Sequence, residues 1–153
     1  NDFSVAVAGT DGLYGGAGDD TLFVGAGGNA YMDGGTGADI FYGGLLADIL
    51  RGGTGNDYLY GNTGGDFFQF YQADFANGNS DIVYFVDGTD RLQFSASLNG
   101  SLFFQNLASL EYAPGLFTTG VYITAFLGGG QTATITVYGT TVASLTPMVE
   151  YTL

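Results

Sequence analysis

Large apolar residues recur at a nearly constant spacing through the first half of the chain. Each stands in the middle of a three-residue segment, and a turn rich in Gly and Asp separates it from the next. Such a segment fits a short β-strand, in which the middle side chain points to one face of the sheet and the side chains of its two neighbours point to the other. The pattern predicts a series of short strands whose interior ladder consists of Leu13, Leu22, Phe41, Leu50, Leu59 and Phe68.

The turns and strands together form a nine-residue repeat, G-G-x-G-x-D-x-U-x, in which U is a large apolar residue. Three segments match it fully: GGAGDDTLF at 15–23, GGTGADIFY at 34–42 and GGTGNDYLY at 52–60. GGLLADILR at 43–51 has Leu46 in place of the third Gly, and GNTGGDFFQ at 61–69 keeps two of the Gly, the Asp and Phe68. A repeat held in one phase predicts a solenoid rather than a Gly-rich low-complexity linker.

Two further segments are weaker copies of the repeat. Residues 6–14 keep only Gly9, Asp11 and Leu13, and residues 24–33 contain ten residues instead of nine. Aligned from its right end, the longer segment has Ala30 at the Asp position and Met32 at the U position. Aligned from its left end, it has Asn29 in place of the Asp. Either alignment removes one carboxylate from the series.

The repeat also predicts how the turns meet. Two nonapeptides complete one coil, so repeats n and n+2 stack about 4.8 Å apart, the spacing of neighbouring strands. The phased Asp20, Asp39, Asp48, Asp57 and Asp66 then face stacked turn carbonyls across a gap lined with oxygen. Hard oxygen ligands in a flexible cage suit Ca²⁺, whereas Mg²⁺ demands stricter octahedral geometry.

Composition and charge narrow the classes of partner that the chain can bind. The formal net charge is −13, and 13 of the 15 acidic residues are Asp. General acidity or salt adaptation would use Glu as freely, so the excess of Asp indicates short carboxylates needed in tight turns. A chain of this charge repels nucleic acid and anionic membrane surfaces. No apolar run approaches the ~20 residues of a membrane span.

The inventory of reactive side chains argues against an enzyme. His, Cys and Lys are absent, and neither Glu111 nor Glu150 lies in a recognisable catalytic motif. The absence of Cys excludes disulfides and thiolate metal sites. The first residues do not resemble a signal peptide. Because they begin close to a repeat, we expect the chain to be a piece of a longer protein.

The second half of the chain has a different pattern. Residues 92–153 read as β-structure, with one short helix expected around Gln105 to Tyr112. Val121 to Phe126 and Ala133 to Tyr138 alternate apolar residues with Thr around Gly128, Gly129 and Gly130, which predicts a hairpin. We therefore expect an all-β chain: a parallel β-roll over 1–69, closed by an antiparallel β cap in 70–153 that covers the open edge of the roll.

With these repeats, the sequence resembles the RTX (repeats-in-toxin) family, and within it the C-terminal regions of serralysin-like proteases. Gly78 to Ser95 is similar to the family's closing segment: Gly88, Asp90 and Arg91 match, whereas Tyr84 stands where that segment has an Asp. The end of the chain, LTPMVEYTL, is similar to the family's C-terminus. That resemblance implies an uncleaved type I secretion signal at Glu150, Tyr151, Thr152 and Leu153.

The resemblance also implies the calcium ligands. In the family, Ca²⁺ lies between stacked turns, held by Asp carboxylates and by carbonyls of the first, second and fourth repeat positions. This pairs Asp20 with Asp39, Asp39 with Asp57, and Asp48 with Asp66. Asp11 and Asp48 would each share a site with the damaged repeat, and Asp74 and Asp81 would complete the last sites. The carbonyl ligands would come from Gly16, Gly18, Gly34, Gly35, Gly37, Gly43, Gly44, Gly52, Gly53, Gly55, Gly61 and Gly64, for about three to six ions.

Two functions fit these expectations. The first is a calcium-binding module of a larger secreted protein, which folds on calcium outside the cell after type I export. The alternative is a glycan- or surface-binding module, like epimerase R-modules, adhesins or surface-layer proteins. Two arginines cannot form a basic groove for an anionic polysaccharide, so a glycan partner would be neutral and bound through exposed Tyr and Phe.

Overall fold

The structure, a computed structural model, describes residues 1–9, 11–75, 78–84, 89–98, 101–113, 116–128, 131–140, 144 and 149–152. These residues form strands and two short 3₁₀ helices, η1 (Gln72–Phe75) and η2 (Ala96–Leu98). The strands are β1 (Phe3–Ala8), β2 (Asp11–Ala17), β3 (Thr21–Gly27), β4 (Ala30–Thr36), β5 (Ile40–Tyr42), β6 (Ile49–Thr54), β7 (Tyr58–Tyr60), β8 (Phe67–Phe70), β9 (Ser80–Tyr84), β10 (Arg91–Ser95), β11 (Leu102–Ala113), β12 (Leu116–Gly128), β13 (Gln131–Tyr138) and β14 (Val149–Thr152).

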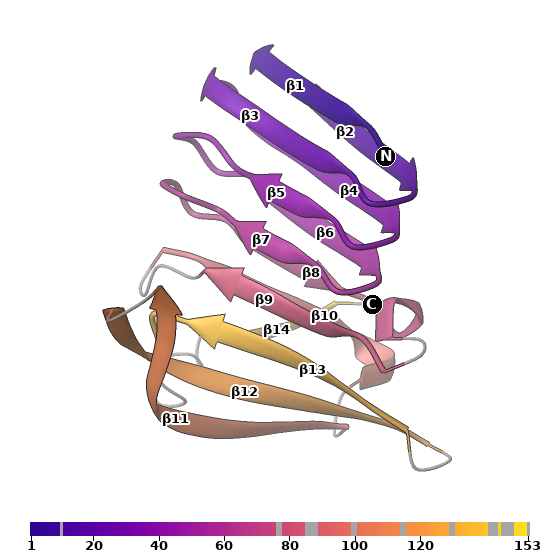
Figure 1. The fold of residues 1–153 in the computed structure, drawn as a ribbon, viewed down its shortest axis with the longest axis vertical. Coiled ribbons are helices and arrows are strands. Elements are labelled where there is room, and N and C mark those ends of the chain that lie inside the picture. The colour runs from indigo at the N-terminus through magenta and orange to yellow at the C-terminus, as the bar shows by residue number, and fades with distance from the viewer. Residues whose placement is uncertain are drawn as a thin grey trace.

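From β1 to β10, successive strands alternate between two sheets, so each pair of repeats makes one coil (Figure 1). One sheet has eight strands in the order β1-β3-β5-β7-β9-β13-β12-β11, and the other has six in the order β14-β10-β8-β6-β4-β2. All pairs from β1 to β10 within each sheet are parallel. The stacking of repeat n on repeat n+2 is confirmed, and the fold is the expected parallel β-roll.

The interior of the roll is formed by the U positions. In one sheet the register aligns Ser4, Leu22, Phe41, Leu59, Val83 and Val137. In the other it aligns Leu13, Met32, Leu50, Phe68, Leu92 and Val149. The six apolar residues predicted for the ladder are all buried. The damaged repeat follows its right-hand alignment, because Ala30 pairs with Asp11 and Met32 lies fully buried between Leu13 and Leu50.

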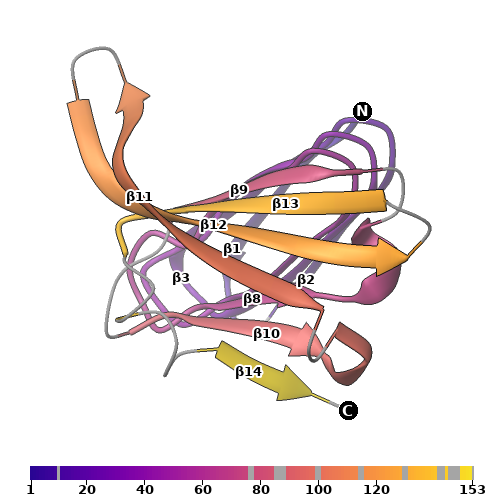
Figure 2. The same ribbon diagram turned by 90° about the horizontal axis from the view of Figure 1, so that it is seen from below.

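The C-terminal half closes the lower end of the roll (Figure 2). Strand β12 pairs in antiparallel fashion with β11 and with β13, and the predicted hairpin is confirmed by the pairing of Val121 with Val137. The helix expected around Gln105 to Tyr112 is wrong, because these residues lie in β11, where Gln105 pairs with Tyr122. The pairing partner in β12 overrides the helix-forming composition of this segment. Gly129 and Gly130 lie outside the described residues.

Parallel stacking continues beyond the last nonapeptide. Strand β13 joins β9 and strand β14 joins β10, both in parallel, so the two sheets of the roll extend directly into the cap. The core continues with them through Phe70, Phe75 and Phe94. No helix among the described residues has the length and hydropathy of a membrane span.

Candidate calcium-binding turns

Aspartates at the sixth repeat position form two columns along the roll. In the first column, the backbone N–H of Asp20 donates to Asp39 Oδ1 at 2.7 Å, that of Asp39 to Asp57 at 2.9 Å and that of Asp57 to Asp81 at 3.1 Å. In the second, the N–H groups of Ala30, Asp48 and Asp66 donate to Oδ1 of Asp48, Asp66 and Asp90. Each carboxylate thus joins its own turn to the turn one coil earlier.

The second oxygen of most of these carboxylates has no partner. Oδ2 of Asp20, Asp39, Asp57 and Asp66 is buried without a hydrogen bond. A buried carboxylate oxygen left without a donor or a cation is costly, because the charged group has lost its hydration. These four atoms therefore mark places where a cation would supply a missing partner.

Burial changes the protonation of the columns. Loss of water raises the pKa of Asp39 to about 6, of Asp57 and Asp66 to about 7, and of Asp81 to about 8. Neighbouring carboxylates raise these pKa values further, and the backbone N–H donors oppose the increase. The columns therefore accommodate negative charge poorly, and a bound divalent cation would restore the ionised form.

The glycines bring carbonyl oxygens close to the carboxylates. A Cβ added at Gly34 would collide with Asp39 Oδ2 and would lie 2.6 Å from the carbonyl oxygen of Gly52. One added at Gly35 would collide with the carbonyl of Gly16. Gly35 also has a φ of +94°, a backbone conformation that residues other than Gly rarely adopt. Only glycine allows the turns to stack this closely, and at Gly34 a carboxylate oxygen and a carbonyl oxygen approach the same residue.

The other predicted carbonyl positions repeat this arrangement. Positive φ values occur at the second and fourth positions of the three fully matching turns, at Gly16, Gly18, Gly35, Gly37, Gly53 and Gly55, and at Asn62 and Gly64 in repeat 61–69. At the first position, Gly43, Gly52 and Gly61 each lie against the Asp of their own repeat: Asp48, Asp57 and Asp66. Among the described residues, no group of three or more acidic, His or Cys side chains could hold a metal alone. Backbone carbonyls would therefore complete any calcium site, as Ca²⁺ coordination allows. The individual ligand assignments stay predictions.

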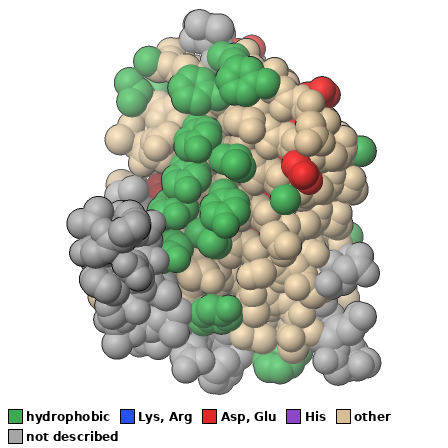
Figure 3. All heavy atoms as spheres, viewed as in Figure 1, with side chains coloured by type: hydrophobic (Ala, Val, Ile, Leu, Met, Phe, Trp, Pro, Cys, Tyr) green, Lys and Arg blue, Asp and Glu red, His purple; other side chains and the backbone are tan. Residues whose placement is uncertain are grey.

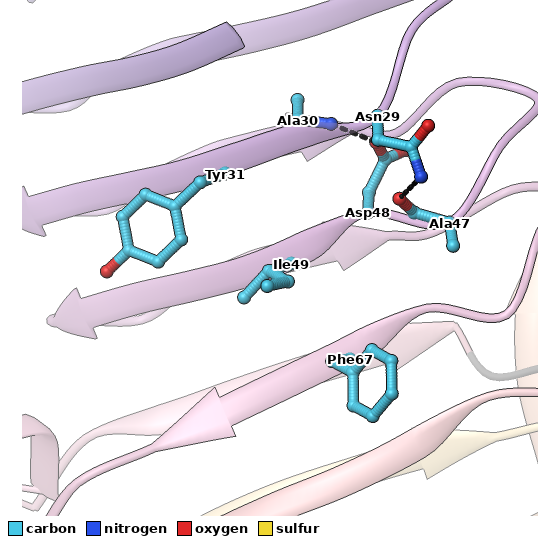
Figure 4. Close-up of a pocket in the computed structure, with 7 residues that line it drawn as sticks. All are labelled: Asn29, Ala30, Tyr31, Ala47, Asp48, Ile49 and Phe67. Carbon is cyan, nitrogen blue, oxygen red and sulfur yellow. Dashed lines mark hydrogen bonds between the residues drawn. The ribbon is translucent and has the colours of Figure 1, made fainter. Parts of the chain in front are cut away.

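The damaged repeat changes one of these sites. Asp48 has both oxygens satisfied, because Ala30 N–H donates to Oδ1 at 2.7 Å and Gly44 N–H donates to Oδ2 at 2.8 Å. The amide of Asn29 donates to the carbonyl of Ala47 at 2.8 Å (Figure 4). Both residues line a surface pocket of about 290 Å³. With Ala30 in place of an Asp and no oxygen of Asp48 left over, this pair of turns lacks the features of the other stacks.

Two of the predicted ligands lie apart from the unsatisfied oxygens. Asp11 is only half-buried and lies opposite Ala30 at the start of β2. Asp74 is buried but lies outside both columns, in η1, where Arg51 and the backbone N–H of Tyr71 bind its carboxylate. Asp81 continues the first column, because its Oδ1 accepts from the backbone N–H of Asp57; its role as a calcium ligand stays a prediction.

The columns contain two aspartates that the sequence reasoning did not assign as ligands. Asp90 accepts from Asp66 N–H at the end of the second column, and the N–H of Asp2 donates to Asp20 Oδ1 at the start of the first. Asp90 is followed two residues later by the buried Leu92, so the Asp-x-apolar spacing could have identified it. Asp2 is followed by Ser4 instead, which hides the same spacing.

Comparison with known protein families identifies the repeat. The family model described as the RTX calcium-binding nonapeptide repeat matches in four copies, over residues 1–31, 24–45 and 33–68. The comparison with curated proteins found no match. Among solved structures, the chain is similar to the AlgE6R3 subunit of the Azotobacter vinelandii mannuronan C5-epimerase, with 21% identity and a TM-score of 0.39, covering 94% of this chain and 79% of that one. The matched residues 1–68 lie within the stacked coils, so this part of the chain is an array of RTX calcium-binding nonapeptide repeats.

Proposed function

We propose that the chain is a calcium-dependent folding module of a larger exported protein. The observation that carries this proposal is the set of four buried, unpaired carboxylate oxygens at Asp20, Asp39, Asp57 and Asp66. Nineteen of the 28 glycines lie between Gly9 and Gly65, and ordering each costs roughly 0.5–1 kcal/mol more than ordering Ala. Calcium bound between the turns would offset both the carboxylate repulsion and this entropy.

We expect the chain to lose most of its β-structure when calcium is removed at neutral pH. Far-UV circular dichroism in excess chelator, followed by titration with Ca²⁺, measures the change. Mg²⁺ at the same concentration serves as the control, since its octahedral preference fits the flexible turns poorly. A chelated chain that keeps its full β-sheet signal would contradict the proposal.

The proposed export of the chain depends on the same calcium binding. Extracellular calcium modules typically bind at ~10⁻⁴–10⁻³ M, well above the calcium concentration of a cytosol. The roll would stay unfolded inside the cell, where its charge of −13 and its glycines keep it soluble. Calcium outside would then fold it and discourage return through the export channel.

The end of the chain is the proposed address for the exporter. Glu150, Tyr151 and Thr152 lie in β14 beside β10, where Gln93 donates to the Glu150 carboxylate at 3.0 Å, and Leu153 lies outside the described residues. In the folded chain β14 is an edge strand, in which Glu150 and Tyr151 are exposed. The signal would act before the roll folds, because the calcium concentration of a cytosol leaves the chain unfolded.

Deleting Glu150 to Leu153 tests this address. We expect the truncated chain to lose secretion from a host with type I export, while calcium-induced folding in vitro is retained. Unchanged secretion would refute the address. Loss of folding together with secretion would mean that these residues serve only as the final strand of the sheet.

A further inference from the structure

The outer face of the eight-stranded sheet has a continuous row of aromatic rings. In register along the roll lie Val5, Phe23, Tyr42, Tyr60, Tyr84 and Tyr138. Ring centroids are 5.1 Å apart for Tyr42 and Tyr60, 4.1 Å for Tyr60 and Tyr84, and 5.1 Å for Tyr84 and Tyr138, with interplanar angles of 11–13°. The rings stack on one another, so their edges and hydroxyl groups face outward. We call this series the tyrosine row.

A second, more apolar row runs beside it. Phe3, Thr21, Ile40, Tyr58 and Ile82 occupy the outward position two residues earlier on the same strands. Phe3 is 71% exposed and Tyr58 is 41% exposed, and in the tyrosine row Tyr42 is 36% exposed. Figure 3 shows the hydrophobic side chains of this face as a stripe that follows the long axis of the roll. Neither row includes a charged residue.

The opposite sheet does not share this face. The positions equivalent to the tyrosine row are Tyr14, Asp33 and Arg51, in register on β2, β4 and β6, followed by Gln69 and Gln93 on β8 and β10. After Tyr14, charged and amide side chains occupy this row, although the repeat and the strands are the same. The row beside it contains Tyr31, Ile49 and Phe67 in register. The two sheets therefore differ in the row that carries stacked rings in the eight-stranded sheet and charged or amide side chains in the other.

The chemistry of this face points to one class of partner. A pyranose ring combines an apolar C–H face with a rim of hydroxyl groups, and the two adjacent rows combine apolar side chains with phenol groups. Burial raises the pKa of the Tyr84 and Tyr138 phenols, and a hydrogen bond with Tyr60 raises that of Tyr84 further. Phenol hydroxyls both donate and accept hydrogen bonds, as sugar hydroxyls do. The rows repeat once per strand, as an extended polymer repeats along its length.

Charge decides between neutral and anionic polymers. The chain has a net charge of −13, with 15 acidic residues against two basic ones, and Arg51 is already engaged by Asp33 and Asp74 on the other sheet. An anionic polysaccharide or a nucleic acid would meet no basic groove, because the chain has only two basic residues. We propose that the outer face of the eight-stranded sheet, formed by the tyrosine row and its apolar neighbour, binds an extended neutral polysaccharide. This binding site goes beyond the export function and does not depend on it.

Affinity electrophoresis with calcium present tests the proposal. The probes are hydroxyethylcellulose and glucomannan, which are neutral, and carboxymethylcellulose, which shares the cellulose backbone but is anionic. We expect at least one neutral probe to retard the native chain, and carboxymethylcellulose not to do so. The double variant Tyr42→Ala with Tyr58→Ala should bind about tenfold more weakly or worse, because it removes a ring from each row.

Tyr14→Ala is the matched control. Tyr14 is a 67%-exposed aromatic residue at the same repeat position on the opposite sheet, so its removal should leave retardation within about twofold of native. Calcium-induced circular dichroism establishes that each variant folds. Retardation by no neutral probe, or equal losses in both variants, would overturn the proposal. So would a dimer, detected by light scattering, that dissociates in the Tyr42/Tyr58 variant, since the face would then pair two copies of the chain.

Discussion

At the residue scale, the repeat acts through pairs formed by its first glycine and its Asp. In 34–42, the Oδ2 of Asp39 lies against the Cα of Gly34 within a space that a Cβ would fill. The same relation holds for Gly52 with Asp57 and for Gly61 with Asp66. The glycine thus fixes where the free carboxylate oxygen lies, and the calcium site depends on both residues.

The calcium sites should therefore be unequal. Asp39 is fully buried, binds the N–H of Asp20 and has an unpaired Oδ2, whereas Asp11 is half-buried opposite Ala30. We expect Asp39→Ala to remove more bound calcium than the matched variant Asp11→Ala. Isothermal titration calorimetry on both variants gives the stoichiometry. Equal losses would show that the column carboxylates are not the ligands.

At the element scale, one arginine connects the roll to the segment that follows it. Arg51 on β6 donates to Asp33 on β4 at 3.1 Å and, through two nitrogens, to Asp74 in η1 at 2.6 and 3.2 Å. Its guanidinium also lies 4.8 Å from the centre of the Tyr71 ring. Hydrogen bonding to Asp74 raises the pKa of Arg51 above its ordinary value. Asp74 is thus better explained as part of this contact than as a calcium ligand.

Removing that arginine should weaken the folded chain. Asp74 is 2% exposed, so Arg51→Ala would leave a buried carboxylate with the Tyr71 N–H as its remaining described partner. We expect the free energy of unfolding to fall by about 1–3 kcal/mol in urea titrations with calcium present. Arg91→Ala is the control, because Arg91 donates to the backbone carbonyls of Thr89 and Asp90. Equal losses for the two variants would show that the contact with Asp74 adds no specific stability.

At the scale of the whole molecule, the carboxylate columns link folding to pH. An unfolded Asp has a pKa of about 3.9, whereas the folded values are about 6 for Asp39, about 7 for Asp57 and Asp66 and about 8 for Asp81. Between pH ~4 and ~8 the folded chain binds more protons than the unfolded one, so without calcium its stability falls as pH rises. Protons and calcium thus stabilise the same columns.

A calcium-free chain should therefore recover β-structure on acidification. We expect a stronger β-sheet signal by circular dichroism at pH 5.5 than at pH 8, and a weaker pH dependence in saturating calcium. Asp81→Asn should reduce the difference, because it removes the carboxyl whose pKa is raised most among these four. Added salt separates this effect from surface repulsion, which salt screens. A signal that does not change with pH would contradict the expectation.

The sequence by itself determined the repeat architecture. Phase is a local property: the nine-residue spacing of Gly, Asp and apolar residues fixes the turns, the interior ladder and the stacking of n on n+2. The two alignments of residues 24–33 could not be separated locally, and stacking decided for Ala30, because Met32 fills the interior between Leu13 and Leu50.

The features of this chain that depend on long-range contacts were decided only by the tertiary structure. Gln105 to Tyr112 became a strand because β12 pairs with it. Asp74, predicted as a ligand of one of the last sites, instead binds Arg51, which lies 23 residues earlier in the chain. The aromatic face likewise arises because alternate repeats stack in the same sheet. Phe23, Tyr42 and Tyr60 therefore lie in register in one sheet, and Asp33 and Arg51 lie in the other. A periodic sequence specifies each coil, but which side chains become neighbours depends on partners that only the folded chain brings together.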